Sequence, residues 1–319
     1  MEDEILHIAT VVSNPLRWET RNNHAVAAIK NWLKEPNIIV YVGEVAHGAR
    51  DHCLIEEFIN HPRVVHIPLK ATTMAWSKEN VLNLIISRMP FQAKYIGTFD
   101  ADILFRKSGW ALETIHQLQI YPVVQPWKTA YDLGPNDDHI QTHKSFSGLY
   151  RDKKPVVSTG SKFWRFDGGQ YDYAHSGYAW AWLRSFLNIV GGLFEYGGMG
   201  SADHHMALGL IGKTERSLPG GVTPEYKAAV LDWGSRANLH LNGKLGVVHQ
   251  TIEHLFHGDK ARRGYLTRWE MFIKHEFNPY TDLKRNSYGV LEFAGNKPDL
   301  EHDFTLYLES RQEDNNFIG

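Results

Sequence analysis

Two aspartates separated by a single residue, Asp100 and Asp102, directly follow the apolar, β-prone segment 95–99. Side chains two positions apart on a strand point the same way, so both carboxylates are expected at the end of that strand. Two buried carboxylates at this spacing repel each other unless a cation or hydrogen bonds compensate. A hard divalent ion that also carries substrate phosphates would suit them. An isolated Asp-X-Asp is more often a simple polar turn. Other residues of the chain must therefore indicate whether this pair binds a metal ion.

Three histidines late in the chain are possible partners for a metal at this aspartate pair: His249, His254 and His257. A catalytic metal site uses few protein ligands and keeps open positions. One aspartate with one late imidazole would leave room for diphosphate oxygens, and the nitrogen ligand favours Mn²⁺ over Mg²⁺. We expect His257, which precedes Gly258, to be the ligand, with the other two in reserve. The alternatives are ordinary core or surface histidines, or a zinc site at His254 and His257, which no cysteine supports.

A glycine-rich bend over residues 191–200 leads into a predicted helix whose first turn carries Asp203. Glycines let the backbone approach a ligand closely, and a carboxylate on a first helical turn is both exposed and positioned. Asp203 could therefore act as the general base that deprotonates an attacking alcohol. The alternative is that Asp203 only caps the helix.

Several basic residues could clamp phosphate groups, because arginine offers a planar fork of donors for them. The candidates are Arg17, Arg21, Lys78, Arg262, Arg263 and Arg268. Most lysines and arginines in any protein are ordinary surface charges. Each of these residues could therefore bind phosphate or only lie at the surface.

The composition is that of an ordinary globular protein. The chain has 319 residues, 43% of them hydrophobic and 22% charged, with a formal net charge of −2. This balance gives no general attraction to nucleic acid or to anionic membranes. The single cysteine, Cys53, excludes an intrachain disulfide and fits a reducing compartment. Neither a signal peptide nor an apolar run of membrane-spanning length is apparent, so we expect a cytoplasmic protein without a membrane partner.

The elements that must position these residues alternate along the first part of the chain. Apolar runs predict strands over residues 5–12, 38–42, 64–68 and 95–99, and helical spacing predicts helices over 25–33, 53–59, 76–88 and 110–118. This order is typical of an α/β protein with an open, mostly parallel sheet, in which ligands bind at the carboxyl ends of the strands. We expect a loop over 43–50, a long polar loop over 128–164, a helix over 178–190, a strand at 247–249 and a surface tail over 298–319.

The ordered set of motifs resembles the metal-dependent glycosyltransferases of the GT-A fold, a Rossmann-like fold. Residues 76–83 are similar to the helix bearing Lys and Asn that precedes the Asp-X-Asp strand in that family. Residues 197–203 look like the Gly-Gly-Glu-Asp turn of inverting members, with the acid pair reduced to Ala202-Asp203. Residues 175–205, and residues 254–258 with Arg263, Gly264, Tyr265 and Arg268, resemble proteins of bacteriophages and bacteria that are assigned as glycosyltransferases. The resemblance covers residues 5–285.

The resemblance implies a transferase (EC 2.4) that moves a sugar from a nucleotide-sugar, a UDP-sugar first of all, to an acceptor hydroxyl. One GT-A domain would span residues 1–297, with a nucleotide-sugar half at 1–127 and an acceptor-side, metal-completing half at 128–297. Asp203 would be the base of an inverting reaction. The metal, Mn²⁺ or Mg²⁺, would be held by Asp102 and His257, with Asp100 on the ribose or a metal-bound water. The donor would be held by Thr10, Asn14, Arg17, Arg21 and Lys78, and its diphosphate by Arg263 and Arg268.

Two other functions and the acceptor stay open at this point. A nucleotidyltransferase needs the same metal and phosphate contacts but has no need of Asp203, and a carbohydrate- or nucleic-acid-binding protein would need no catalysis. The acceptor could be a glycan, a protein hydroxyl or hydroxymethylated phage DNA, the last held by the basic stretch at residues 260–268. The oligomeric state has no signal in the sequence.

Overall fold

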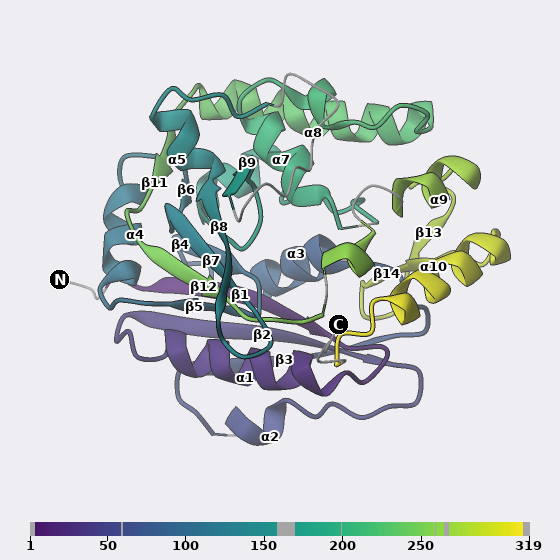
Figure 1. Ribbon diagram of the computed structural model, residues 1–319, viewed down its shortest axis with the longest axis horizontal. Helices are drawn as coiled ribbons and strands as arrows, with labels where there is room; N and C mark the ends of the chain where they lie inside the picture. The colour runs from purple at the N-terminus through teal and green to yellow at the C-terminus, as the bar shows by residue number, and fades with distance from the viewer. Residues whose placement is uncertain are drawn as a thin grey trace.

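A seven-stranded sheet lies at the centre of the computed structural model, which describes residues 4–58, 60–157, 170–198, 200–258, 260–264 and 268–314 (Figure 1). Its strand order is β11-β6-β10-β4-β1-β2-β3. The strands are β1 (Leu6–Ser13), β2 (Ile38–His47), β3 (Val64–Ala71), β4 (Tyr95–Phe99), β6 (Val123–Gln125), β10 (Ala179–Leu183) and β11 (Leu245–Val247). Only β10 runs antiparallel to its neighbours in this sheet. The predicted α/β fold with a mostly parallel sheet is therefore confirmed.

Helices cover both faces of this sheet and enclose two hydrophobic cores. Side chains alternate along β1: Ile8 belongs to one core and Ala9 to the other, as the period of two in a strand requires. One face is covered by α1 (Glu19–Trp32) and α4 (Trp110–Leu118). The other is covered by α3 (Lys78–Arg88), α6 (Arg184–Val190), α7 (Ala202–Leu210) and α8 (Pro224–Leu241) (Figure 1).

A second sheet of five strands joins segments that lie far apart in the sequence. Its order is β5-β12-β7-β8-β9, with β5 (Ile103–Phe105), β7 (Thr129–Leu133), β8 (His139–Ser145), β9 (Gln170–His175) and β12 (Thr251–His254). β12 pairs antiparallel with β5 and parallel with β7. The backbone N–H of Leu255 donates to the carbonyl of Asp102 over 2.9 Å. This pairing carries the late histidines to the Asp-X-Asp turn.

The remaining elements surround these two sheets. They are α2 (Ile55–Phe58), α5 (Phe146–Arg151), α9 (Arg268–Lys274), α10 (Pro298–Ser310), the 3-10 helices η1 (Thr214–Ser217) and η2 (Lys260–Arg263), and the hairpin of β13 (Leu283–Arg285) and β14 (Leu291–Phe293). Figure 1 places α9, α10 and the hairpin together at one end of the molecule. In the part of the chain that the structure describes, no helix is long and apolar enough to cross a membrane.

Several expectations about the elements are wrong. The helix expected over 178–190 is β10 followed by α6, because Trp180 and Trp182 face one core while Ala179 and Ala181 face the other. The loop expected over 128–164 contains β7, β8 and α5, although residues 158–164 lie outside the described part. β2 continues to residue 47 through the loop expected at 43–50, and the late strand covers 245–247 instead of 247–249.

The surface tail expected from residue 298 is also wrong for the residues that the structure describes. Residues 298–310 form α10, whose Leu300, Phe304 and Leu308 are buried in the larger core. Arg311 and Glu313 are buried as well. Charged residues dominate this stretch of sequence, but its apolar residues recur at helical spacing and anchor it. Residues 315–319 lie outside the described part.

Candidate active site

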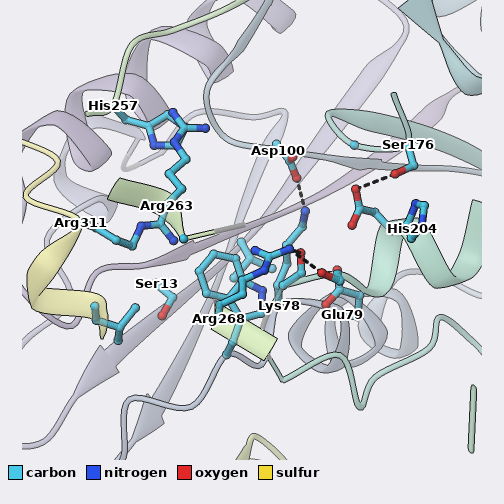
Figure 2. Close-up of a pocket in the computed structure, with 18 of the residues that line it drawn as sticks. Ser13, Lys78, Glu79, Asp100, Ser176, His204, His257, Arg263, Arg268 and Arg311 are labelled. Atoms are coloured by element: carbon cyan, nitrogen blue, oxygen red, sulfur yellow. Dashed lines mark hydrogen bonds and ion pairs between the residues drawn. The ribbon is translucent and has the colours of Figure 1, made fainter. Parts of the chain in front are cut away.

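A cavity of about 850 Å³ opens at the carboxyl ends of β1 and β4. This is the sheet edge where ligands bind in open α/β folds, and the volume suits a small-molecule ligand. Of the predicted site residues, Arg21, Lys78, Asp100, Asp102, Asp203, His257, Arg263 and Arg268 all line it. Figure 2 shows His257, Arg263 and Arg311 on one side, Ser176 and His204 on the other, and Lys78 with Asp100 between them.

Asp102 and two histidines form a cluster that could hold a metal ion. One ligand atom from each of Asp102, His254 and His257 lies within 4.8 Å of the others. The Nε2 atoms of His254 and His257 lie 3.5 and 3.2 Å from Oδ2 of Asp102. The structure thus brings Asp102 and His257 together as predicted, and adds His254. Asp100 does not belong to this cluster, and His249 is an exposed residue outside the cavity wall.

The three side chains of this cluster suit a divalent metal ion. Oδ1 of Asp102 is buried and accepts no hydrogen bond within the described residues. A buried carboxylate oxygen without a donor is costly, and a cation would compensate it. Burial alone raises the pKa of Asp102, but the charge and hydrogen bonds of His254 and His257 outweigh it and hold this pKa well below its usual range. An ionised carboxylate with two imidazole nitrogens suits Mn²⁺ or Zn²⁺ better than Mg²⁺.

His254 is held from behind by a buried carboxylate. Its Nδ1 lies 2.9 Å from Oδ1 of Asp132, which also accepts from the Tyr178 hydroxyl over 2.6 Å. The other oxygen of Asp132 lies 2.6 Å from Nε2 of His143. Burial lowers the pKa of His254, but Asp102 and Asp132 outweigh this effect and raise it to about 9. Burial and Arg263 instead lower the pKa of His257 to about 3.

Lys78 and Asp100 form an ion pair at the cavity wall (Figure 2). Lys78 is the first residue of α3, where the helix dipole disfavours a cation, so a carboxylate opposite it is needed. Burial raises the pKa of Asp100, with Asp102 and Asp203 acting in the same direction and Lys78 opposing them. The next residue, Glu79, is buried in the cavity wall, and burial is the main cause that raises its pKa to about 7.

Asp203 lies in the first turn of α7, as predicted. Gly200 adopts a φ of +77° against the ring of Trp76, and a Cβ on Gly197 would lie 2.5 Å from that of Ala202. Both glycines are therefore required by the bend that leads into this helix. Oδ2 of Asp203 accepts from the Ser176 hydroxyl over 3.1 Å. The hydroxyl of Ser201, the residue before α7, makes no cap and instead accepts from Arg268.

Arginines and one glutamate close the cavity at the end of α10. The guanidinium of Arg21 holds Glu313 with two bonds, Nε to Oε2 at 2.6 Å and Nη2 to Oε1 at 2.8 Å. Arg311 reaches the same carboxylate at 2.8 Å and lies over the ring of Trp76. Burial alone would raise the pKa of Glu313, but these two arginines lower it to about 2. Arg21 thus lines the cavity as predicted, but with its charge already paired.

Three residues that were predicted to hold the nucleotide-sugar do not line the cavity. Thr10 is fully buried, and its hydroxyl donates to the carbonyl of Phe99 over 2.9 Å. Asn14 shapes the loop after β1 through hydrogen bonds to the backbone of Trp18. Arg17 is exposed, outside the wall. Two motif residues, Met199 and Tyr265, lie outside the described part of the chain.

The sequence offered little signal for the site residues that were missed. Asp132 is an isolated acid in a segment expected to be a loop, and Glu313 lies in the expected tail. Glu79 follows Lys78 in a helix that was predicted, and its burial depends on contacts across the sheet edge. The β-prone residues Thr129 and Tyr131 were the one signal that could have placed Asp132 on a strand.

The sequence matches no known protein-family model, and no curated protein matches it. Solved structures share a distant likeness. A fragment of S. aureus TarS, residues 1–349, in complex with UDP-GlcNAc is 10% identical, with a TM-score of 0.42 over 80% of this chain and 60% of that one. The mannosyltransferase PcManGT from Pyrobaculum calidifontis, in complex with GDP-Man and Mn²⁺, is 13% identical, with a TM-score of 0.35 over 75% and 70% of the two chains.

A third likeness is to a different kind of enzyme. The 4-diphosphocytidyl-2C-methyl-D-erythritol synthase of Anaerococcus prevotii is 10% identical, with a TM-score of 0.37 over 78% of this chain and 88% of that one. At TM-scores this low we transfer no activity from these proteins to the chain.

Proposed function

We propose that this protein is a metal-dependent glycosyltransferase that moves a sugar from a nucleotide-sugar, a UDP-sugar first of all, to an acceptor hydroxyl. The observation that carries the proposal is the cluster of Asp102, His254 and His257 in the wall of a cavity that also contains Asp203 and arginines. Metal ligands, phosphate-binding cations and a separate carboxylate base are the parts that such a transfer needs.

Each part has a defined task in this reaction. Asp102, His254 and His257 would hold a divalent ion, which would supply positive charge for the leaving nucleoside diphosphate. Arg263 and Arg268 add donors for the diphosphate oxygens. The bond between the anomeric carbon and the phosphate oxygen breaks as the acceptor oxygen forms the new bond from the opposite face.

The acceptor proton passes to Asp203 in this scheme, and the anomeric configuration inverts. The hydrogen bond from Ser176 fixes the Asp203 carboxylate in the cavity, which supports its role as base. Lys78 forms an ion pair with Asp100 and so offsets part of the negative charge that Asp100, Asp102 and Asp203 bring to the cavity wall. Asp100 would accept a hydrogen bond from a ribose hydroxyl of the nucleotide-sugar or from a water on the metal.

A small acceptor such as a glycan hydroxyl is favoured over DNA by the positions of Arg263 and Arg268. Arg263 is buried, and Arg263 and Arg268 both line the cavity. Cations inside a cavity suit the diphosphate of the donor, whereas binding a DNA backbone requires them on an open surface. Hydroxymethylated DNA, added as a test acceptor, should therefore receive no sugar.

Calorimetric titration with UDP and GDP, with and without Mn²⁺, tests the proposal. The wild-type protein should bind one nucleoside diphosphate in a metal-dependent manner, and Asp102→Ala should lose this binding. Asp232→Asn, at an exposed acid on α8, is the matched control and should bind normally. Metal-independent binding, or no binding to any nucleotide, contradicts the proposal. Release of pyrophosphate instead of nucleoside diphosphate would indicate a nucleotidyltransferase.

A further inference from the structure

We propose that Asp132 is the positioning residue that prepares His254 for the metal ion, an inference that rests on the metal site of the proposed function. Asp132 does not belong to the metal cluster and lines no part of the cavity, and His254 is the member of the cluster that it contacts.

The backbone places the two residues opposite each other. β7 and β12 are parallel neighbours, and Asp132 and His254 are partners in their register. Asp132 is 1% exposed, and its Oδ1 lies 2.9 Å from Nδ1 of His254. Since this carboxylate is fixed by the sheet and cannot reach water, it imposes one ring orientation on His254.

The hydrogen bond also decides which ring nitrogen is available. A carboxylate only accepts hydrogen bonds, so Nδ1 of His254 must carry a proton toward Asp132. The other ring nitrogen, Nε2, is the atom that faces Asp102. When a metal ion binds there and takes the place of a proton on Nε2, the lone pair of this nitrogen is the ligand. A carboxylate behind a metal-binding histidine is a recurrent way to fix tautomer and orientation.

Further contacts keep Asp132 itself in place. The Tyr178 hydroxyl donates to the same oxygen, Oδ1, over 2.6 Å, and the ring of Tyr178 stacks on His175 at 4.0 Å between centroids. His143 holds the other oxygen at 2.6 Å. Among the described residues alone, this buried carboxylate contacts His254, Tyr178 and His143, and such a network gives His254 a rigid support.

The test compares Mn²⁺ binding by the full chain, without nucleotide, in the wild type, Asp132→Asn and Glu44→Gln. Glu44 is a matched control, because it is also a buried carboxylate that holds a histidine, His66 at 2.8 Å, but it does not line the cavity. Calorimetry should give a Mn²⁺ affinity about 10–100-fold weaker for Asp132→Asn and unchanged for Glu44→Gln. The visible spectrum of the Co²⁺-loaded protein should change only in Asp132→Asn.

A second variant keeps the inference testable if Asp132→Asn does not fold. Tyr178→Phe removes one hydrogen bond from Asp132 but keeps the ring that packs on His254 at 4.7 Å between centroids. It should weaken Mn²⁺ binding by about fivefold. Wild-type affinity in Asp132→Asn, or in Tyr178→Phe where the first variant is unfolded, overturns the role of Asp132 and leaves the proposed function intact. A wild-type protein that binds neither Mn²⁺ nor Co²⁺ overturns the metal site and the proposed function with it.

Discussion

The Nε2 atoms of His254 and His257 face each other across 3.1 Å. Two bare nitrogen lone pairs at this distance repel, so a proton or a cation has to lie between them or beside Asp102. The pKa of His254 is raised to about 9, while that of His257 is lowered to about 3. In the absence of metal, His254 therefore carries the proton that the ion must replace.

Metal binding should consequently release a proton at neutral pH. Because His254 is protonated below a pKa of about 9, the Mn²⁺ affinity should rise by about tenfold for each pH unit up to that value. Calorimetry in buffers of different ionisation enthalpy measures the released proton directly. An affinity that does not change with pH would show that no imidazole proton is displaced.

His257→Ala should weaken Mn²⁺ binding strongly, because it removes a ligand. Loss of a residue that only hydrogen-bonds to a metal ligand usually weakens metal binding about 10–100-fold. Loss of a ligand itself should weaken it at least as much. His249→Ala is the control, since His249 is exposed and lies outside the cavity wall. Equal losses in both variants would mean that the cluster has been assigned to the wrong histidines.

Asp203→Asn should slow transfer strongly while binding of the nucleotide-sugar persists. The amide cannot accept the acceptor proton, so kcat should fall by about 10²–10⁴-fold. The KM for the nucleotide-sugar should stay near the wild-type value, because the metal cluster is untouched. Asp232→Asn serves again as the control. If the donor KM rises as much as kcat falls, Asp203 binds the donor and is not the base.

Glu79→Gln should change how stability depends on pH. The pKa of Glu79 is raised by burial from 4.5 to about 7 in the folded state, so the folded state binds more protons than the unfolded state between these values. Stability is therefore lost as the pH rises from about 4.5 to 7, by about 3 kcal/mol. The glutamine variant should lack this loss in urea unfolding. Glu225→Gln, at an exposed position on α8, should retain the wild-type slope.

Glu313→Gln should destabilise the fold, because it leaves Arg21 and Arg311 without their buried counter-charge. Removing one partner of such a group typically costs about 3–5 kcal/mol. The wild-type contribution is present above about pH 4.5 and is lost as the pH falls toward 2, since the pKa of Glu313 is lowered. Urea unfolding at neutral pH measures the difference, with Glu309→Gln at the exposed end of α10 as control. A difference within error would show that the arginines find other partners.

The class of fold and much of the cavity wall were predictable from the sequence. Local patterns carried this information: an apolar run before Asp100, helical spacing in α3 and α4, and glycines before Asp203. These signals depend on neighbours in the chain, so they need no knowledge of the tertiary structure. They were also sufficient to place Asp100 and Asp102 at the carboxyl end of a strand, where the cavity lies.

The parts that could not be predicted depend on pairing between distant segments. Asp132 acquires its role only because β7 lies beside β12, and Glu313 acquires its role because α10 packs against the core. Thr10 was misplaced for a related reason: its strand position was right, but its side chain bonds to β4 and faces away from the cavity. The choice of which distant segments pair and pack decides such details, and local patterns in the sequence do not specify that choice.

The position of β12 between β5 and β7 has a consequence for the growing polypeptide. His254 follows Asp132 by 122 residues, so a ribosome-bound chain carries the carboxylates of the site long before it has the imidazoles. Until residues 251–257 have emerged, the second sheet lacks the strand that joins its two parts. A nascent chain that stalls earlier therefore exposes unpaired strand edges of β5 and β7, which are sites for chaperone capture or aggregation.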